Sequence, residues 1–168
     1  AAPRRTTLAE PLKNRFGAEI PARIAAAITA VHPDFPRAAF VEQALEGFEP
    51  LDLMARGRHL AQVLRRHLPP SYEGALEILL ASLGPRLEAE PNGMAPFFYL
   101  PHVELVAQHG LGHFEPSMRA LHQLTQRFTA EFSIRPFIEA YPKASLARLH
   151  EWVTDPSPHV RRLVSEGT

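Results

Sequence analysis

The fold class is decided by the stretch Thr154-Asp155-Pro156-Ser157-Pro158-His159-Val160-Arg161-Arg162-Leu163-Val164-Ser165-Glu166-Gly167-Thr168. Asp155-Pro156 ends one helix, and Ser157-Pro158 opens the next with serine as N-cap and proline at the first helical position. A short amphipathic helix of the pattern Val-Arg-Arg-Leu-Val follows. This order of helix, proline-marked break and helix is typical of HEAT-type repeats. We therefore expect an all-α fold, a HEAT-like helical repeat solenoid.

The rest of the chain supports this expectation, because apolar residues recur at helical spacing and prolines or glycines separate the runs. No segment alternates apolar and polar residues over the length of a strand. In the helix over 51–68 the arginines 56, 58, 65 and 66 are expected to point largely outward. We expect an N-terminal arm over 1–16, a loop over 85–96, and helices over 20–31, 36–49, 51–68, 71–84, 102–109, 115–135 and 143–153, with Pro136 starting a new turn.

The repeat domain is expected to span 17–168 and to be incomplete at its C-terminal end. The sequence stops within the last helix, before any partner helix that would cover its apolar side. We therefore expect Val160, Leu163 and Val164 to be exposed. Exposed apolar patches favour association, so this predicts self-association through the last repeat.

Composition limits the classes of protein that remain. The chain has 168 residues, 45% of them apolar and 21% charged, which is enough for one globular domain with a core. It contains no cysteine, which excludes disulfides and thiolate zinc sites. No apolar run has membrane-spanning length, and we expect a cytoplasmic protein without a membrane partner. The net charge of zero argues against non-specific coating of nucleic acid but leaves room for one concave basic strip.

Two polar stripes are candidate functional sites. If the helix through Phe128 continues to Arg135, then Arg127, Glu131 and Arg135 share a face beside a buried edge of Phe128 and Phe132. A carboxylate between two guanidinium groups is expected to stay ionised. In the last helix, a second face carries His159, Arg162 and Glu166. Both stripes also fit ordinary solvated rows of ion pairs.

The chain has nine histidines, and two of them lie in His109-Gly110-Leu111-Gly112-His113. The glycines break the helix there, so the i to i+4 geometry of a zinc-binding pair is not formed. We expect no metal and no cofactor. Trp152 has core spacing and is expected to pack in the interior.

Several blocks closely resemble the AlkC family of bacterial DNA alkylation repair proteins, in its N-terminal portion. The blocks are Phe128-Thr129-Ala130-Glu131-Phe132-Ser133-Ile134-Arg135-Pro136-Phe137, His159-Val160-Arg161-Arg162-Leu163 with Ser165-Glu166-Gly167-Thr168, and, upstream, Ile78-Leu79-Leu80-Ala81-Ser82-Leu83-Gly84-Pro85. The resemblance implies an all-helical HEAT-like DNA glycosylase, related to the AlkD branch, that removes cationic N3-alkylated bases such as 3-methyladenine and 3-methylcytosine.

By this resemblance Glu131 and Glu166 correspond to active-site carboxylates, and Arg161 and Arg162 lie in the helix that faces DNA. Arg127, Arg135 and His159 are further candidates for DNA contacts, and double-stranded DNA carrying alkylated bases is the expected partner. Family members continue beyond the Glu-Gly-Thr block with further repeats. The alternative is a non-catalytic HEAT-repeat scaffold that binds DNA or protein. A pure scaffold has no reason to direct both carboxylates into one basic groove, so the placement of Glu131 and Glu166 discriminates between the two.

Overall fold

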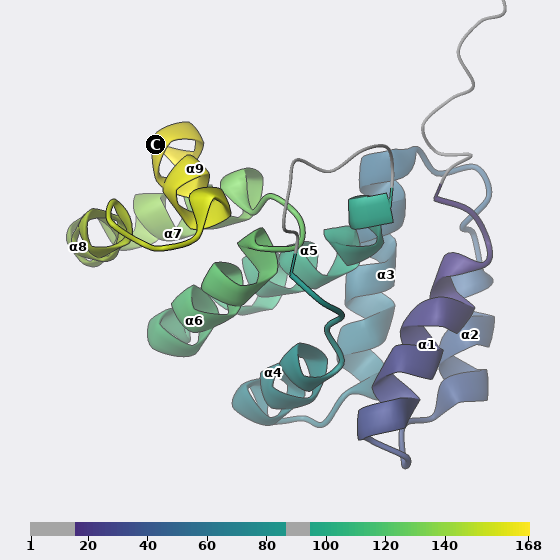
Figure 1. The fold of residues 1–168 in the computed structure, drawn as a ribbon. Coiled ribbons are helices and arrows are strands. Elements are labelled where there is room, and N and C mark those ends of the chain that lie inside the picture. Colours follow the sequence, from purple (N-terminus) through teal and green to yellow (C-terminus); the bar gives the residue numbers. More distant parts are fainter. Residues whose placement is uncertain (1–15, 87–94) are drawn as a thin grey trace, which may run out of the picture.

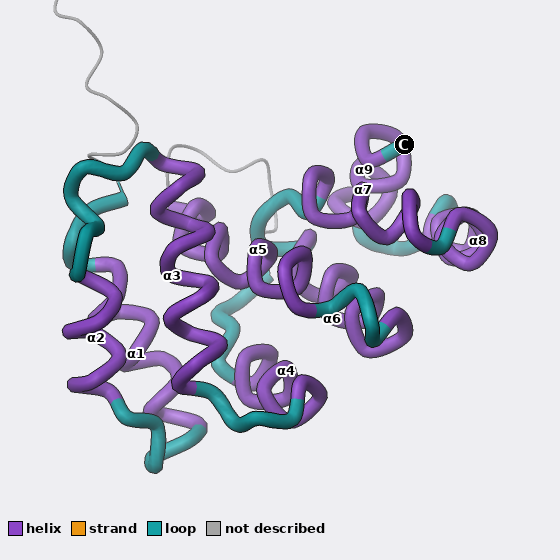
Figure 2. The backbone as a smooth tube through the Cα atoms, turned by 180° about the vertical axis from the view of Figure 1, so that it is seen from behind, coloured by secondary structure: helices purple, strands orange, loops and turns teal. Residues whose placement is uncertain are grey.

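The computed structural model describes residues 16–86 and 95–168, and every regular element in these two ranges is a helix (Figures 1 and 2). The expected all-α helical repeat fold is therefore confirmed. Residues 1–15 of the expected arm and 87–94 of the expected loop lie outside the described residues. The elements are α1 (Ile20–Val31), α2 (Arg37–Leu45), α3 (Leu53–His67), α4 (Tyr72–Ala81), η2 (Ala95–Tyr99), α5 (Leu100–His109), α6 (Phe114–Thr125), α7 (Glu131–Ala140), α8 (Pro142–Trp152) and α9 (Pro158–Gly167).

The helices form two layers. One row consists of α3, α5, α7 and α9, in which each helix packs against the next. The second layer covers this row: α2 packs on α3, α6 packs on α5, α7 and α9, and α8 packs on α7 and α9. Figure 1 shows the order in space, with α1 to α3 at one end of the molecule and α7 to α9 at the other. Because neighbours in the row come from successive repeats, side chains far apart in sequence meet along it.

Local sequence signals set the helix boundaries. The side chain of Asp52 accepts a hydrogen bond from the N–H of Ala55 at 2.9 Å, and that of Ser71 accepts one from the N–H of Gly74 at 3.2 Å, so both residues cap their helices. Ser157 occupies the N-cap position of α9 with Pro158 after it, as expected. Its own side chain makes no capping bond.

A glycine sets the spacing of the row at its first contact. A Cβ placed on Gly57 of α3 would lie 2.6 Å from Cγ of Leu100 in α5. No other residue fits there without a shift of Leu100, so α3 and α5 approach closely. At the other end of the row, a Cβ on Gly167 would lie 3.0 Å from Cγ2 of Ile134. The end of α9 is thus held against α7.

The expectation for Arg56 is wrong, because its side chain is buried rather than outward. Arg56 is 1% exposed. Its Nη1 donates to the carbonyl of Phe16 at 2.9 Å and its Nη2 to the carbonyl of Glu49 at 2.8 Å, and the guanidinium lies 4.5 Å from the centre of the Phe48 ring. The sequence carried a signal, since Arg56 shares a helical stripe with Leu60 and Val63.

The expected long helix over 115–135 is also wrong. α6 ends at Thr125, and α7 begins anew at Glu131. Pro136 lies inside α7 instead of starting a new turn. As a result Arg127 belongs to neither helix, and Phe132 is 59% exposed instead of buried.

The expected exposure of the last helix is contradicted as well. Val160 is 0% exposed and Leu163 is 1% exposed, because α9 packs on α6, α7 and α8, and Val164 is partly buried against the same core. The apolar patch from which self-association was predicted is therefore absent, and that prediction loses its physical basis. Trp152 is buried in the core, as expected.

Candidate active site

The structure brings Glu131 and Glu166 together, although they lie in different repeats. Glu131 is the first residue of α7, and Glu166 lies in the last turn of α9. The close approach of Gly167 to Ile134 places the end of α9 beside the first turns of α7. The two carboxyl groups consequently lie close enough to interact, and the pKa of Glu131 responds to Glu166.

The pKa of Glu131 shifts in the direction opposite to the one that flanking arginines alone would give. Burial, the hydrogen bond with Glu166 and the negative charge of Glu166 raise the pKa of Glu131, and Arg135 and Arg162 only partly oppose this rise. Two neighbouring carboxylates disfavour double ionisation. The ionised form of Glu131 is therefore less favourable here than in an isolated glutamate, and a cation placed beside it would favour that form.

Two arginines flank the pair. Nε of Arg162 lies 3.1 Å from Oε1 of Glu166 on the same face of α9. Arg135 lies one turn along α7 from Glu131, and its guanidinium sits 4.7 Å from the centre of the Phe132 ring. Sequence reasoning placed Phe132 in the core and so missed this exposed ring. The ring lies beside Arg135, and an exposed aromatic surface can contact a planar ligand.

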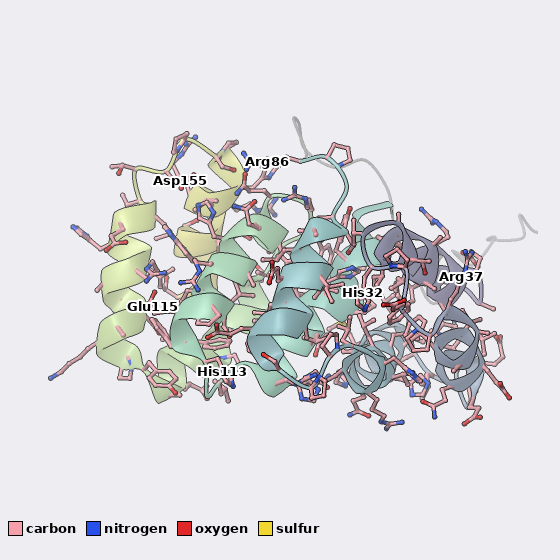
Figure 3. All side chains as sticks on the ribbon, turned by 90° about the horizontal axis from the view of Figure 1, so that it is seen from below. His32, Arg37, Arg86, His113, Glu115 and Asp155 are labelled. Carbon is pink, nitrogen blue, oxygen red and sulfur yellow. The ribbon has the colours of Figure 1, made fainter. Side chains whose placement is uncertain are left out.

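The connection between α8 and α9 fixes the start of α9 and takes Arg161 out of the cluster. Nη1 of Arg161 donates to the carbonyl of Asp155 at 2.6 Å, so this side chain folds back over the turn. Asp155 lies at the edge of the molecule (Figure 3). It accepts hydrogen bonds from the N–H of Ser157 and from Nε2 of His122, both at 2.8 Å. Burial raises the pKa of Asp155. The two hydrogen bonds and the charges of His122 and Arg161 together lower it by more, so the pKa of Asp155 lies below its ordinary value.

Arg127 also lies apart from Glu131, in the turn between α6 and α7. Its Nε donates to the carbonyl of Gly84 at 2.8 Å and its Nη1 to the carbonyl of Gln123 at 2.8 Å. The N–H of Gly84 in turn donates to the hydroxyl of Tyr99 at 2.9 Å. Arg127 thus ties the segment after α4 to the turn before Glu131.

His159 is half-buried in the first turn of α9, seven residues before Glu166. This separation corresponds to about 10 Å along the helix. The structure therefore assembles Glu131, Glu166, Arg135 and Arg162 in one place, and leaves Arg127, Arg161 and His159 outside it.

The described ranges contain no group of three or more histidine, aspartate or glutamate side chains arranged to hold a metal ion. Among the described helices, none combines the length and the apolar character needed to cross a membrane.

No family model matches this chain. The Bacillus subtilis (strain 168) protein YhaZ, which is uncharacterised, is 33% identical over 158 residues, covering 94% of this chain and 42% of YhaZ. The solved structure of the Pseudomonas fluorescens alkylpurine DNA glycosylase AlkC, bound to DNA containing an abasic site analogue, matches with a TM-score of 0.83 at 35% identity. It covers 95% of this chain and 43% of AlkC.

This chain belongs to the AlkC-like family. It spans less than half the length of both relatives. The match to AlkC includes the helical repeat fold, so the paired rows of helices in this chain are a feature of the AlkC-like architecture.

Proposed function

We propose that this protein is a DNA glycosylase of alkylation repair, which hydrolyses the N-glycosidic bond of cationic N3-alkylated bases in double-stranded DNA. The observation that carries the proposal is the pair of carboxyl groups of Glu131 and Glu166, joined across α7 and α9. The similarity to AlkC, a glycosylase solved with DNA, supports the reaction class. We propose 3-methyladenine and 3-methylcytosine as substrates.

The chemistry required by such a substrate is simple. An N3-alkylated base already carries a positive charge, so the bond to the sugar is weakened without a general acid. The protein must stabilise the positive charge that develops on the sugar and must position a water molecule. An ionised carboxylate stabilises the charge, and the second carboxylate accepts a proton from the attacking water.

The two neighbouring carboxyl groups give a basis for selecting a cationic base. In the free protein, burial and the charge of Glu166 raise the pKa of Glu131 and so disfavour its ionised form. A cationic lesion beside it favours the doubly ionised form, whereas a neutral base does not. The exposed ring of Phe132 offers a planar apolar surface at the same place, and Arg135 and Arg162 supply positive charge for the flanking phosphates.

The test is base release from methylated duplex DNA by the full-length protein under single-turnover conditions. Glu131→Gln retains the size of the side chain and removes the charge that stabilises the sugar cation. We expect excision to slow on the order of a hundredfold, equivalent to about 3 kcal/mol. DNA affinity should remain nearly unchanged. Glu139→Gln is the matched control, because Glu139 is an exposed residue of the same helix.

Unchanged excision by the Glu131 variant would remove the catalytic role of the pair. Absence of excision by the wild-type protein, together with retained DNA binding, would instead favour the non-catalytic scaffold.

A further inference from the structure

A groove lies between the exposed faces of α3 and α5, outside the cluster around Glu131. It is a wide, open depression of about 780 Å³, lined by Arg58, Gln62, Arg65, Arg66, Gln108 and His109. None of the lining residues is acidic. Arg58, Gln62 and Arg66 are exposed side chains, so the groove opens to solvent.

The groove is positively charged. Arg58 and Arg66 have no ion-pair partner within 4 Å among the described residues. Glu104, a half-buried residue of α5, interacts electrostatically with Arg58 and with the side chain of Gln108. Burial raises the pKa of Glu104, and three arginines outweigh this one carboxyl group.

Part of the groove is preorganised. Nη1 of Arg65 donates to the carbonyl of Pro69 at 2.9 Å and Nη2 to the carbonyl of Pro70 at 2.7 Å, so this guanidinium is a fixed charge. Nε2 of Gln108 donates to the carbonyl of Arg58 at 3.4 Å, which ties α5 to α3 at the groove. Basic side chains in the last turn of a helix also complement its dipole. That explanation does not cover Arg58, which lies in the second turn of α3.

The dimensions suit a nucleic-acid backbone. Arg58 and Arg66 are eight residues apart in α3, or about 12 Å along the helix axis. One DNA strand advances 3.4 Å per phosphate, so this distance corresponds to roughly three to four nucleotides. Glutamine side chains between the arginines can donate to phosphate oxygens. The groove lies on the same row of helices as the carboxylate pair, because α5 packs on both α3 and α7.

We infer that the α3–α5 groove binds the phosphate backbone of duplex DNA away from the lesion, with Arg58 and Arg66 as its contacts. This inference rests on the proposed function for the identity of the ligand. It extends the DNA-binding surface to a part of the molecule that carries none of the residues expected from the sequence.

The experiment measures binding of the full-length protein to an undamaged duplex by fluorescence anisotropy over a series of salt concentrations. The test variant is the double substitution Arg58→Gln and Arg66→Gln. Each lost phosphate contact reduces the slope of log affinity against log salt by about 0.9, so we expect a reduction of roughly two. Affinity at low salt should fall on the order of tenfold. A second variant, Gln62→Glu, places a negative charge in the groove and should weaken binding in the same direction.

The matched control removes two positive charges elsewhere, through Arg37→Gln and Lys143→Gln. Both residues are exposed, and neither lines the groove. Arg37 lies at the far end of the molecule from Asp155 (Figure 3). Thermal unfolding checks that all variants fold.

A salt slope in the groove variant equal to that of the control would overturn the inference. So would preferential binding of polyglutamate or single-stranded RNA over the duplex. Base release is measured in parallel, so that failure of this inference and failure of the proposed function can be distinguished. If the wild-type protein shows no excision but its salt slope depends on the groove, only the proposed glycosylase activity is refuted. If excision is normal and the groove variant leaves the salt slope unaffected, only the proposed role of the groove is refuted.

Discussion

The two ends of the molecule use charged side chains in opposite ways. Near α3, Arg56 is 1% exposed, and its guanidinium donates to the backbone carbonyls of Phe16 and Glu49. Near α7 and α9, Glu131 and Glu166 face each other at the surface, where burial and mutual repulsion raise the pKa of Glu131. The guanidinium of Arg56 therefore holds two segments of the backbone together. The carboxyl groups of Glu131 and Glu166, in contrast, keep an unfavourable mutual repulsion that the fold does not need.

This contrast separates structural from functional charge by physical criteria. A buried guanidinium that satisfies two carbonyls stabilises the folded state, and removing it leaves acceptors without partners. Like charges held together at a surface destabilise the folded state slightly and are available for a ligand of opposite charge.

Replacement of Arg56 by methionine should give the largest loss of stability. The carbonyls of Phe16 and Glu49 would lose their donor, and each unsatisfied buried acceptor costs about 1–3 kcal/mol. We expect the free energy of unfolding to fall by about 3 kcal/mol in urea titrations. Arg66→Met, on the exposed face of the same helix, should change it by less than about 0.5 kcal/mol. Equal losses in the free energy of unfolding for Arg56→Met and Arg66→Met would contradict the structural role of the Arg56 side chain.

Replacement of Arg127 by methionine should show whether its charge stabilises the fold, like that of Arg56, or is available for a ligand, like those of Glu131 and Glu166. The sequence predicts a DNA contact, whereas the structure has its side chain donating to the carbonyls of Gly84 and Gln123. We expect a loss of about 2 kcal/mol in the free energy of unfolding. Excision should slow as well, because the turn before Glu131 is released, while the salt slope of duplex binding should stay unchanged. A smaller salt slope of duplex binding with an unaltered free energy of unfolding would instead support the DNA contact that the sequence predicts for Arg127.

The pH dependence of stability should reveal the strained pair. Glu131 has a raised pKa in the folded state, so the unfolded chain loses this proton first as pH rises above the ordinary value of 4.5. Its contribution to stability is therefore present at low pH and declines as pH rises from 4.5 through the raised pKa. Glu131→Gln removes this decline. Relative to wild type, the variant should gain stability between pH 4 and pH 7, by less than about 1 kcal/mol because solvent screens the pair.

Urea titrations of both proteins at the two pH values measure this difference. A variant that is less stable than wild type by the same amount at pH 4 and pH 7 would show that Glu131 makes a purely structural contribution.

Much of the fold was predictable because its signals are local. Prolines, capping residues and helical spacing predicted most of the helix boundaries, including the start of α9 at Ser157-Pro158. The predictions failed where the outcome depends on neighbours from other repeats. The break between α6 and α7 has no glycine or proline to indicate it, and it turned Phe132 outward. The apolar side of α9 is covered by helices that precede it, which the pattern within α9 does not reveal.

The sequence by itself determined the helical repeat class and the residues from which a site can be built, because helical periodicity and capping act over a few residues. Only the tertiary structure decided which of them meet. Glu131 and Glu166 lie 35 positions apart and come together because Gly167 lets the end of α9 approach Ile134. Arg161 and Arg127 instead donate to the backbone carbonyls of Asp155 and Gly84. Contact between repeats depends on the shapes of surfaces distant in sequence, and short-range patterns do not encode it.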